Sequence, residues 1–216
     1  KNNFDFVKVE GKEKIDLINK IKSQLDKKIF SKSGEKRFND WNRGWKENYV
    51  EYIKSNFKSE KLIPKYIHGD RPVRWKKNFI IPKKKFIEWR FSTVFRSWLF
   101  KKYFKDVNEI FDFGTGTACH LELLSKIYPK KRIIGLDWSI YSVKIINLLI
   151  KKKNLNIFGK KFNFFNINNS LKIPNNSAIM TYGALEQVGT RHKKFIDFLI
   201  KKKPKICVHV ECMNEM

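Results

Sequence analysis

The sequence predicts an α/β fold in which a doubly wound, mostly parallel sheet is covered by helices on both faces. Short apolar runs typical of buried parallel strands alternate with helical patterns over residues 106–216. The first run, Ile110-Phe-Asp-Phe113, leads directly into a glycine-rich turn, and a later run ends at Asp137. In such a fold the ligand crevice lies at the carboxyl ends of the strands, which is where we expect the functional site.

Residues 1–105 lack this alternation and predict a helical amino-terminal extension. Apolar spacing indicates helices over residues 12–28, 41–57 and 84–104, with Asp40 as the expected cap of the second. The third helix should bury an apolar face made of Ile87, Phe91, Val94, Phe95, Trp98 and Leu99. An irregular stretch should precede it, punctuated by Pro64, Gly69, Pro72 and Pro82.

The second helix of the extension carries three aromatic residues at helical spacing, Trp41, Trp45 and Tyr49. They share one face, so the extension either forms a lid over the site or packs against the main domain.

Residues 106–216 form the second predicted domain, in which the elements alternate. Strands are expected near residues 109–113, 132–137, 161–166, 177–182 and 205–211. Helices are expected over residues 117–128, 139–152 and 190–202.

The glycine turn after the first strand indicates a site for a nucleoside-containing cofactor. Its spacing is D-x-G-x-G-x-G, with Asp112, Gly114, Gly116 and, in the last place, Ala118. A dinucleotide site would place the third small residue where Cys119 stands, and a P-loop would require a Lys-Ser/Thr ending. Thr115, inside the turn, is a further candidate cofactor contact.

Asp137 ends the second strand, 25 residues after Asp112, as one strand-helix-strand unit requires. A carboxylate there can accept hydrogen bonds from both hydroxyls of a ribose. The alternative is that Asp137 caps the helix that opens at Ser139. Trp138 either stacks on adenine or packs in the core.

These motifs resemble those of class I S-adenosylmethionine-dependent methyltransferases, which have a Rossmann-like fold. The resemblance implies S-adenosyl-L-methionine as cofactor, methyl transfer by direct displacement, and Asn166 in the place of the acid that binds the adenine amino group. It also implies that Gly183, in Gly183-Ala-Leu-Glu-Gln187, lies at the methyl-transfer face. The sequence lacks Asn/Asp-Pro-Pro-Tyr/Phe at this point, which argues against a base amine as acceptor.

A looser resemblance, in Trp41-Asn-Arg-Gly-Trp45 and Val208-His-Val-Glu211, is to a group of bacterial methyltransferases, some tied to surface glycans. We therefore expect a small-molecule or glycan-precursor substrate. If the acceptor is a hydroxyl group, Glu186 or His209 is the candidate base. Glu186 could instead be a cap or exposed, and His209 a core histidine on the same strand face as Glu211.

Arg90 could pair with the cofactor carboxylate, or form a surface ion pair.

The net charge of +26 allows RNA as an alternative partner. Only 8 of the 47 basic residues are arginine, and lysine runs such as residues 151–153 favour a solvated surface instead. Three cysteines, Cys119, Cys207 and Cys212, lack metal-ligand spacing and are read as reduced thiols of a cytoplasmic protein. The chain has no apolar run long enough to span a membrane.

The chain stops just after its fifth predicted strand and begins without Met, whereas the resembling fold has seven strands. We therefore expect it to be part of a longer protein. Three functions remain open: a small-molecule or glycan methyltransferase, an RNA methyltransferase, and a non-catalytic methyltransferase-like binding subunit.

Overall fold

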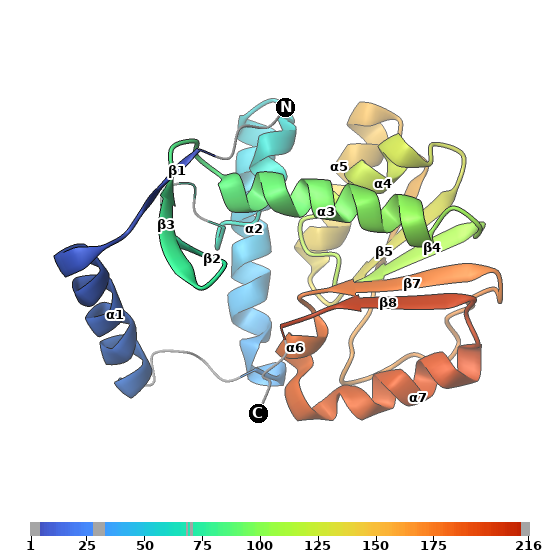
Figure 1. Ribbon diagram of the computed structural model, residues 1–216. Coiled ribbons are helices and arrows are strands. Elements are labelled where there is room, and N and C mark those ends of the chain that lie inside the picture. The colour runs from blue at the N-terminus through green and yellow to red at the C-terminus, as the bar shows by residue number, and fades with distance from the viewer. Residues whose placement is uncertain (1–4, 28–32, 68, 70, 213–216) are drawn as a thin grey trace. The chain divides into compact units, whose positions relative to one another are not determined.

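The computed structural model describes residues 5–27, 33–67, 69 and 71–212 (Figure 1). The chain divides into two compact units, each described by itself below. The first comprises Lys1–Lys32 and Lys65–Phe95, and the second comprises Ser33–Pro64 and Arg96–Met216. The long helix α3, Ile87–Tyr103, begins in the first unit and ends in the second.

The first unit contains α1, Gly11–Asp26, and a three-stranded antiparallel sheet of order β1-β3-β2. Its strands are Phe6–Lys8, Val73–Trp75 and Asn78–Pro82. The sequence pattern missed this sheet. The turn between β2 and β3 places Lys76 and Lys77 at φ values of +46° and +67°, so it lacks the Asn-Gly or Gly signal by which such hairpins are recognised.

The second unit confirms the predicted fold class, because it contains a five-stranded, entirely parallel sheet of order β6-β5-β4-β7-β8. The strands are β4 (Glu109–Phe113), β5 (Arg132–Asp137), β6 (Ile157–Lys161), β7 (Ser177–Tyr182) and β8 (Ile206–Val210). The order reverses between β4 and β7, which places the switch point of the sheet beside the glycine turn.

The prediction of the third strand was wrong in position. The strand ends at Lys161 instead of spanning residues 161–166. Phe162 and Phe164, which suggested it, fill the hydrophobic core from the loop that follows. An edge strand pairs on one side only, so β6 forms from a half-polar sequence, while the apolar run belongs to the loop.

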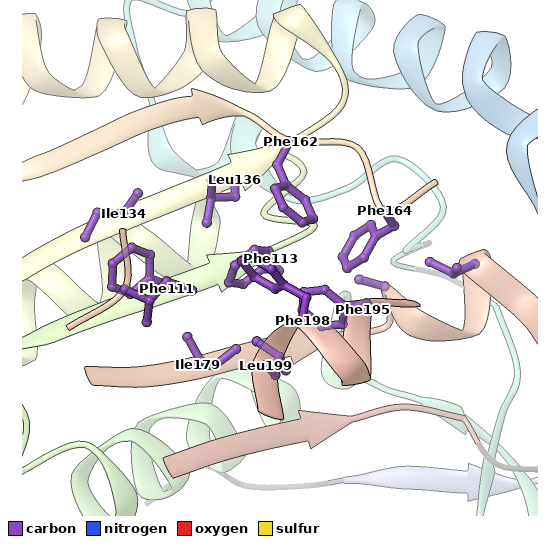
Figure 2. Close-up of a cluster of buried hydrophobic side chains, with 13 residues drawn as sticks. Phe111, Phe113, Ile134, Leu136, Phe162, Phe164, Ile179, Phe195, Phe198 and Leu199 are labelled. Atoms are coloured by element: carbon purple, nitrogen blue, oxygen red, sulfur yellow. The ribbon is translucent and has the colours of Figure 1, made fainter. Parts of the chain in front are cut away.

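Helices cover both faces of this sheet (Figure 1). On one face lie α4 (Cys119–Ile127) and α5 (Ile140–Lys153), and on the other lies α7 (Lys193–Lys202). Figure 2 shows the core between the sheet and α7, where Phe113 packs edge-on against Phe195 at 5.0 Å between ring centroids. Gly135 lets α4 pack closely on the sheet, since a Cβ there would lie 2.7 Å from the Leu121 side chain and would force it to shift.

The second unit also includes α2, Phe38–Lys54, which is flanked by the 3-10 turns Glu35–Arg37 and Ser59–Leu62. The short helix α6, Leu185–Val188, and a 3-10 turn, Gly189–His192, connect β7 to α7. The prediction that Asp40 caps α2 was wrong. It lies in the first turn and forms ion pairs with Arg37 and Arg43 at 3.2 and 3.1 Å.

The predicted apolar face of α3 was wrong in part, since only Leu99 of its six residues is fully buried. Phe91, Val94 and Trp98 are exposed, whereas Arg96, Leu99 and Phe100 are buried. The buried face is therefore centred on Arg96. A search for apolar residues at helical spacing does not find such a face, because arginine is charged. Within the described part of the chain, no helix combines the length and apolar character needed to cross a membrane.

Candidate functional site

The glycine turn connects β4 to α4 and lies at the carboxyl edge of the sheet. Gly114, Gly116 and Ala118 have φ values of +78°, +55° and +59°, so the backbone turns sharply through the left-handed region. The N–H groups of Gly114 and Thr115 donate to the carbonyl of Leu136 at 2.7 and 3.1 Å. These bonds attach the turn to the neighbouring strand β5.

Two neighbours explain why the turn needs its glycines. A Cβ at Gly114 would lie 2.4 Å from the Cβ of Ala184, in the loop after β7. A Cβ at Gly116 would lie 3.0 Å from the ring of Trp45, which is buried on α2. Side chains of the protein itself therefore occupy part of the space that the two glycines leave open.

Asp137 closes the turn from the end of β5. Its Oδ2 accepts the Gly116 N–H at 2.9 Å, and its Oδ1 accepts the Ser139 N–H at 2.8 Å. Each oxygen retains acceptor capacity for a further donor, such as a ribose hydroxyl. Burial raises the pKa of this carboxyl to about 6, against the opposing effect of the two backbone N–H groups. The cap of α5 is Ser139, whose Oγ accepts the Tyr141 N–H.

A second carboxylate, that of Asp112, is fully buried on the neighbouring strand β4. Neither of its oxygens has a hydrogen-bond partner among the described residues, and the same holds for the Thr115 hydroxyl. The ring nitrogen Nδ1 of His120 lies 3.4 Å from Asp112 Oδ2. A buried carboxylate with free acceptor capacity beside a glycine turn can take a cationic or hydrogen-bonding ligand.

Trp138 lies against an aromatic residue that the sequence analysis did not select. Its ring centroid is 5.7 Å from that of Phe165, in the loop after β6, and Phe38 of α2 packs edge-on at 5.2 Å. Arg191 lies over the other ring of the pair, 4.4 Å from the Phe165 centroid. Asn166, the neighbour of Phe165, is exposed and donates its backbone N–H to the Asn163 carbonyl.

The loop after β7 holds the predicted residues Gly183 and Glu186. Gly183 has a φ of +62°, and its N–H donates to the carbonyl of Val210 on β8. The structure brings two acidic residues together here, since Glu211 Oε2 accepts the backbone N–H of Glu186 at 3.2 Å. Glu186 Oε2 in turn accepts the Cys212 N–H.

His209, the other candidate base, lies on β8, two residues before Glu211. Its Nδ1 is 2.8 Å from the Thr181 hydroxyl, and burial lowers its pKa, while the Glu211 charge acts in the opposite direction. His209 thus pairs with Thr181 on the neighbouring strand β7, whereas Glu186 is joined to Glu211 by a different hydrogen bond.

Within the second unit, α3 brings Arg96 next to the start of α4, while the role of Arg90 stays a prediction. Arg90 belongs to the first compact unit, whereas Arg96 belongs to the second and is only 1% exposed. Its Nη1 donates to Cys119 Sγ at 3.6 Å. Arg96, His120 and Phe165 are the residues that sequence reasoning missed. Arg96 could have been found from the sequence, because it stands four residues before Phe100 and therefore on the same helix face.

No family model and no curated protein matches the sequence. Among solved structures, the chain is similar to the plantazolicin methyltransferase BpumL in complex with SAH, at 21% identity and a TM-score of 0.40, covering 51% of this chain and 40% of that one. It is also similar to a SAM-dependent methyltransferase from Aquifex aeolicus, at 19% identity and a TM-score of 0.43, covering 56% and 65%.

A third similar structure is the Pyrococcus abyssi tRNA (uracil-54, C5)-methyltransferase with S-adenosyl-L-homocysteine, at 15% identity and a TM-score of 0.41, covering 54% and 28%. The match to the plantazolicin enzyme spans about two fifths of that chain's length.

Proposed function

We propose that this protein binds S-adenosyl-L-methionine at the carboxyl edge of β4 and β5 and transfers its methyl group to a small molecule or glycan precursor. The observation that carries the proposal is the left-handed glycine turn, held by Asp137 through the Gly116 N–H at 2.9 Å. The glycine turn and Asp137 lie at the carboxyl ends of the adjacent parallel strands β4 and β5, beside the switch point of the sheet.

The residues present fit this cofactor. Asp137 would receive the ribose hydroxyls on the acceptor sites that its two backbone bonds leave free. Asp112, with both oxygens unpartnered among the described residues, would face the positively charged methionine end, together with Thr115. Trp138 and Phe165 would hold the adenine by ring contacts, with Asn166 beside them.

The bound cofactor would supply an electrophilic methyl group, so the protein mainly has to align the acceptor and exclude water. Gly183 provides open backbone at this edge, since a Cβ there would meet only Glu186 Oε1 at 3.8 Å. The Glu186–Glu211 pair is the proposed binder and base for a hydroxyl acceptor. His209, hydrogen-bonded to Thr181, is the alternative base.

Calorimetry with S-adenosylhomocysteine and the intact chain tests the cofactor assignment. We expect saturable binding by the wild type and at least a roughly tenfold loss in Asp137→Ala, because one charged hydrogen bond contributes about 1.5–3 kcal/mol. Trp138→Ala should weaken binding as well, without touching the turn. Asp106→Ala is the matched control, since that carboxylate is exposed and ion-paired only at the surface.

Absence of binding by a wild-type protein with a normal circular dichroism spectrum would refute the cofactor claim. If a folded Asp137→Ala variant binds S-adenosylhomocysteine as tightly as the wild type, the cofactor site lies elsewhere in the protein.

The net charge of +26 favours RNA as a second candidate acceptor. Titration with a single-stranded RNA oligonucleotide at several salt concentrations separates the two. A steep decline of the logarithm of the RNA-binding constant with the logarithm of the salt concentration supports RNA as acceptor, because phosphate contacts release counterions. Weak binding with a shallow slope supports the small acceptor.

A further inference from the structure

Cys119 has a charged environment that the proposed function does not use. It is the first residue of α4 and directly follows the glycine turn, and its side chain is partly exposed. The guanidinium of Arg96, itself buried, donates to its sulfur at 3.6 Å. A thiol at a helix amino terminus beside a buried cation is in a position that favours the thiolate.

A second cation completes the cluster. His120 follows Cys119 in the sequence, and its Nδ1 lies 3.4 Å from the buried carboxylate of Asp112. Neither that nitrogen nor the Asp112 oxygens have a hydrogen-bond partner among the described residues. Tyr182 of β7 packs edge-on against the imidazole at 5.0 Å between ring centroids. The structure thus holds an imidazole between a carboxylate and a thiol.

The charges in this cluster act on the two titrating groups in opposite directions. Burial alone would raise the pKa of Cys119, but the neighbouring His120 and Arg96 lower it to about 7. Burial alone would lower the pKa of His120, but the negative charges of Cys119 and Asp112 raise it to about 9. At neutral pH the pair therefore holds a substantial fraction of thiolate and imidazolium.

The other two cysteines provide an internal contrast. Cys207 and Cys212 are both more exposed than Cys119. Burial of part of its side chain raises the pKa of Cys207, and a hydrogen bond with Glu186 together with its charge raises that of Cys212. The accessible thiols are thus the less ionised ones.

We propose that Cys119 is a covalent modification site, whose thiolate reacts with hydroperoxides and with soft electrophiles in preference to Cys207 and Cys212. With a hydroperoxide, the sulfur attacks one peroxide oxygen, forming an S–O bond while the O–O bond breaks. Cys119 is oxidised to a sulfenic acid, and the peroxide is reduced to an alkoxide or hydroxide. That anion takes a proton from the His120 imidazolium.

Alkylation rates measured on each cysteine test the proposal in the wild-type chain. Iodoacetamide at limiting concentration, followed by peptide mass spectrometry, should label Cys119 with a half-maximal rate near pH 7. At pH 7 we expect its rate to exceed those of Cys207 and Cys212 by about tenfold or more, despite its lower exposure, because the thiolate is the reacting form. Hydrogen peroxide with a dimedone probe should mark the same residue.

Variants establish the cause of the reactivity. His120→Gln should shift the labelling profile of Cys119 to higher pH and reduce its rate at pH 7, whereas Arg132→Gln, an exposed arginine, is the matched control. Faster labelling of Cys207 or Cys212 than of Cys119 in the folded wild type at pH 7 would overturn the proposal. So would a Cys119 profile that a folded His120→Gln leaves unchanged. The wild-type comparison decides the question even if the variant does not fold.

Discussion

Two buried carboxylates lie at the ends of adjacent strands in this protein. Asp112 is 0% and Asp137 4% exposed, and the charge of Asp112 contributes to the raised pKa of Asp137. Burying like charges near each other costs free energy unless hydrogen bonds or a cationic ligand compensate. Asp137 has two backbone N–H donors, whereas Asp112 has only the nearby imidazole.

The raised pKa of Asp137 predicts a pH dependence of stability. Its carboxyl has a pKa of about 6 in the folded protein, against a reference of 3.8, so the folded state holds the proton more tightly. This contribution is fully present below about pH 4 and is lost as the pH rises through about 6. Across that window it amounts to about 3 kcal/mol. In Asp137→Asn, the unfolding free energy should lack this decline.

Urea unfolding of both proteins between pH 4 and 7 measures the difference, with Asp106→Asn as the exposed control that keeps the wild-type slope. Parallel pH profiles for Asp137→Asn and the wild type would contradict the assignment.

At the residue scale, sequence spacing alone singled out Asp112, Gly114, Gly116 and Asp137, because a turn and a strand end are local features. His120, Arg96 and Phe165 were missed, since each acts through a partner that lies 8 to 27 residues away in the chain or on another element.

At the scale of elements, α2 is connected to the start of α5 by one hydroxyl. Ser139 Oγ donates to Asn42 Oδ1 at 2.7 Å and also accepts the Tyr141 N–H at 3.2 Å. The same side chain therefore caps one helix and binds another.

Removing this hydroxyl should cost more than removing its partner. Ser139→Ala loses the cap and the interhelical bond, so we expect a destabilisation of about 1–2 kcal/mol. Asn42→Ala loses only the interhelical bond and should cost about 1 kcal/mol or less. Chemical denaturation of both variants and the double variant gives the coupling energy, expected near 0.5–1 kcal/mol.

Ser170→Ala, on an exposed loop, is the control and should change stability little. Full additivity of the Ser139 and Asn42 effects would contradict the direct contact.

Elements with strong periodicity were predicted closely, and those that depend on distant partners were not. β4, β5 and β7 match their predicted residues because both faces of each strand are buried and the apolar run is continuous. The edge strand β6 lacks such a run, so packing of the flanking Phe162 and Phe164 decided where that strand ended.

At the scale of the whole molecule, the dominant feature is the net charge of +26. Like charges at this density repel one another in the compact state and are screened by salt. The melting temperature should therefore rise on going from 20 to 300 mM NaCl, on the order of 5 °C for a stabilisation of 1–2 kcal/mol.

Thermal melts followed by circular dichroism measure this shift. Replacing the exposed residues Lys83, Lys84 and Lys85 by Gln should reduce it, because the net charge falls by three. A melting temperature independent of salt would show that the lysines are already neutralised locally.

The sequence by itself determined the alternation of strands and helices over residues 106–216, the glycine turn and the acid at the end of β5. These depend on local periodicity and on the conformational freedom of glycine, which act over a few residues. Only the tertiary structure decided that Arg96 is buried, that Trp45 lies on Gly116, and that Arg96 contacts Cys119. Those contacts join segments distant in the chain, and the burial that gives their charges strength exists only once the core has formed.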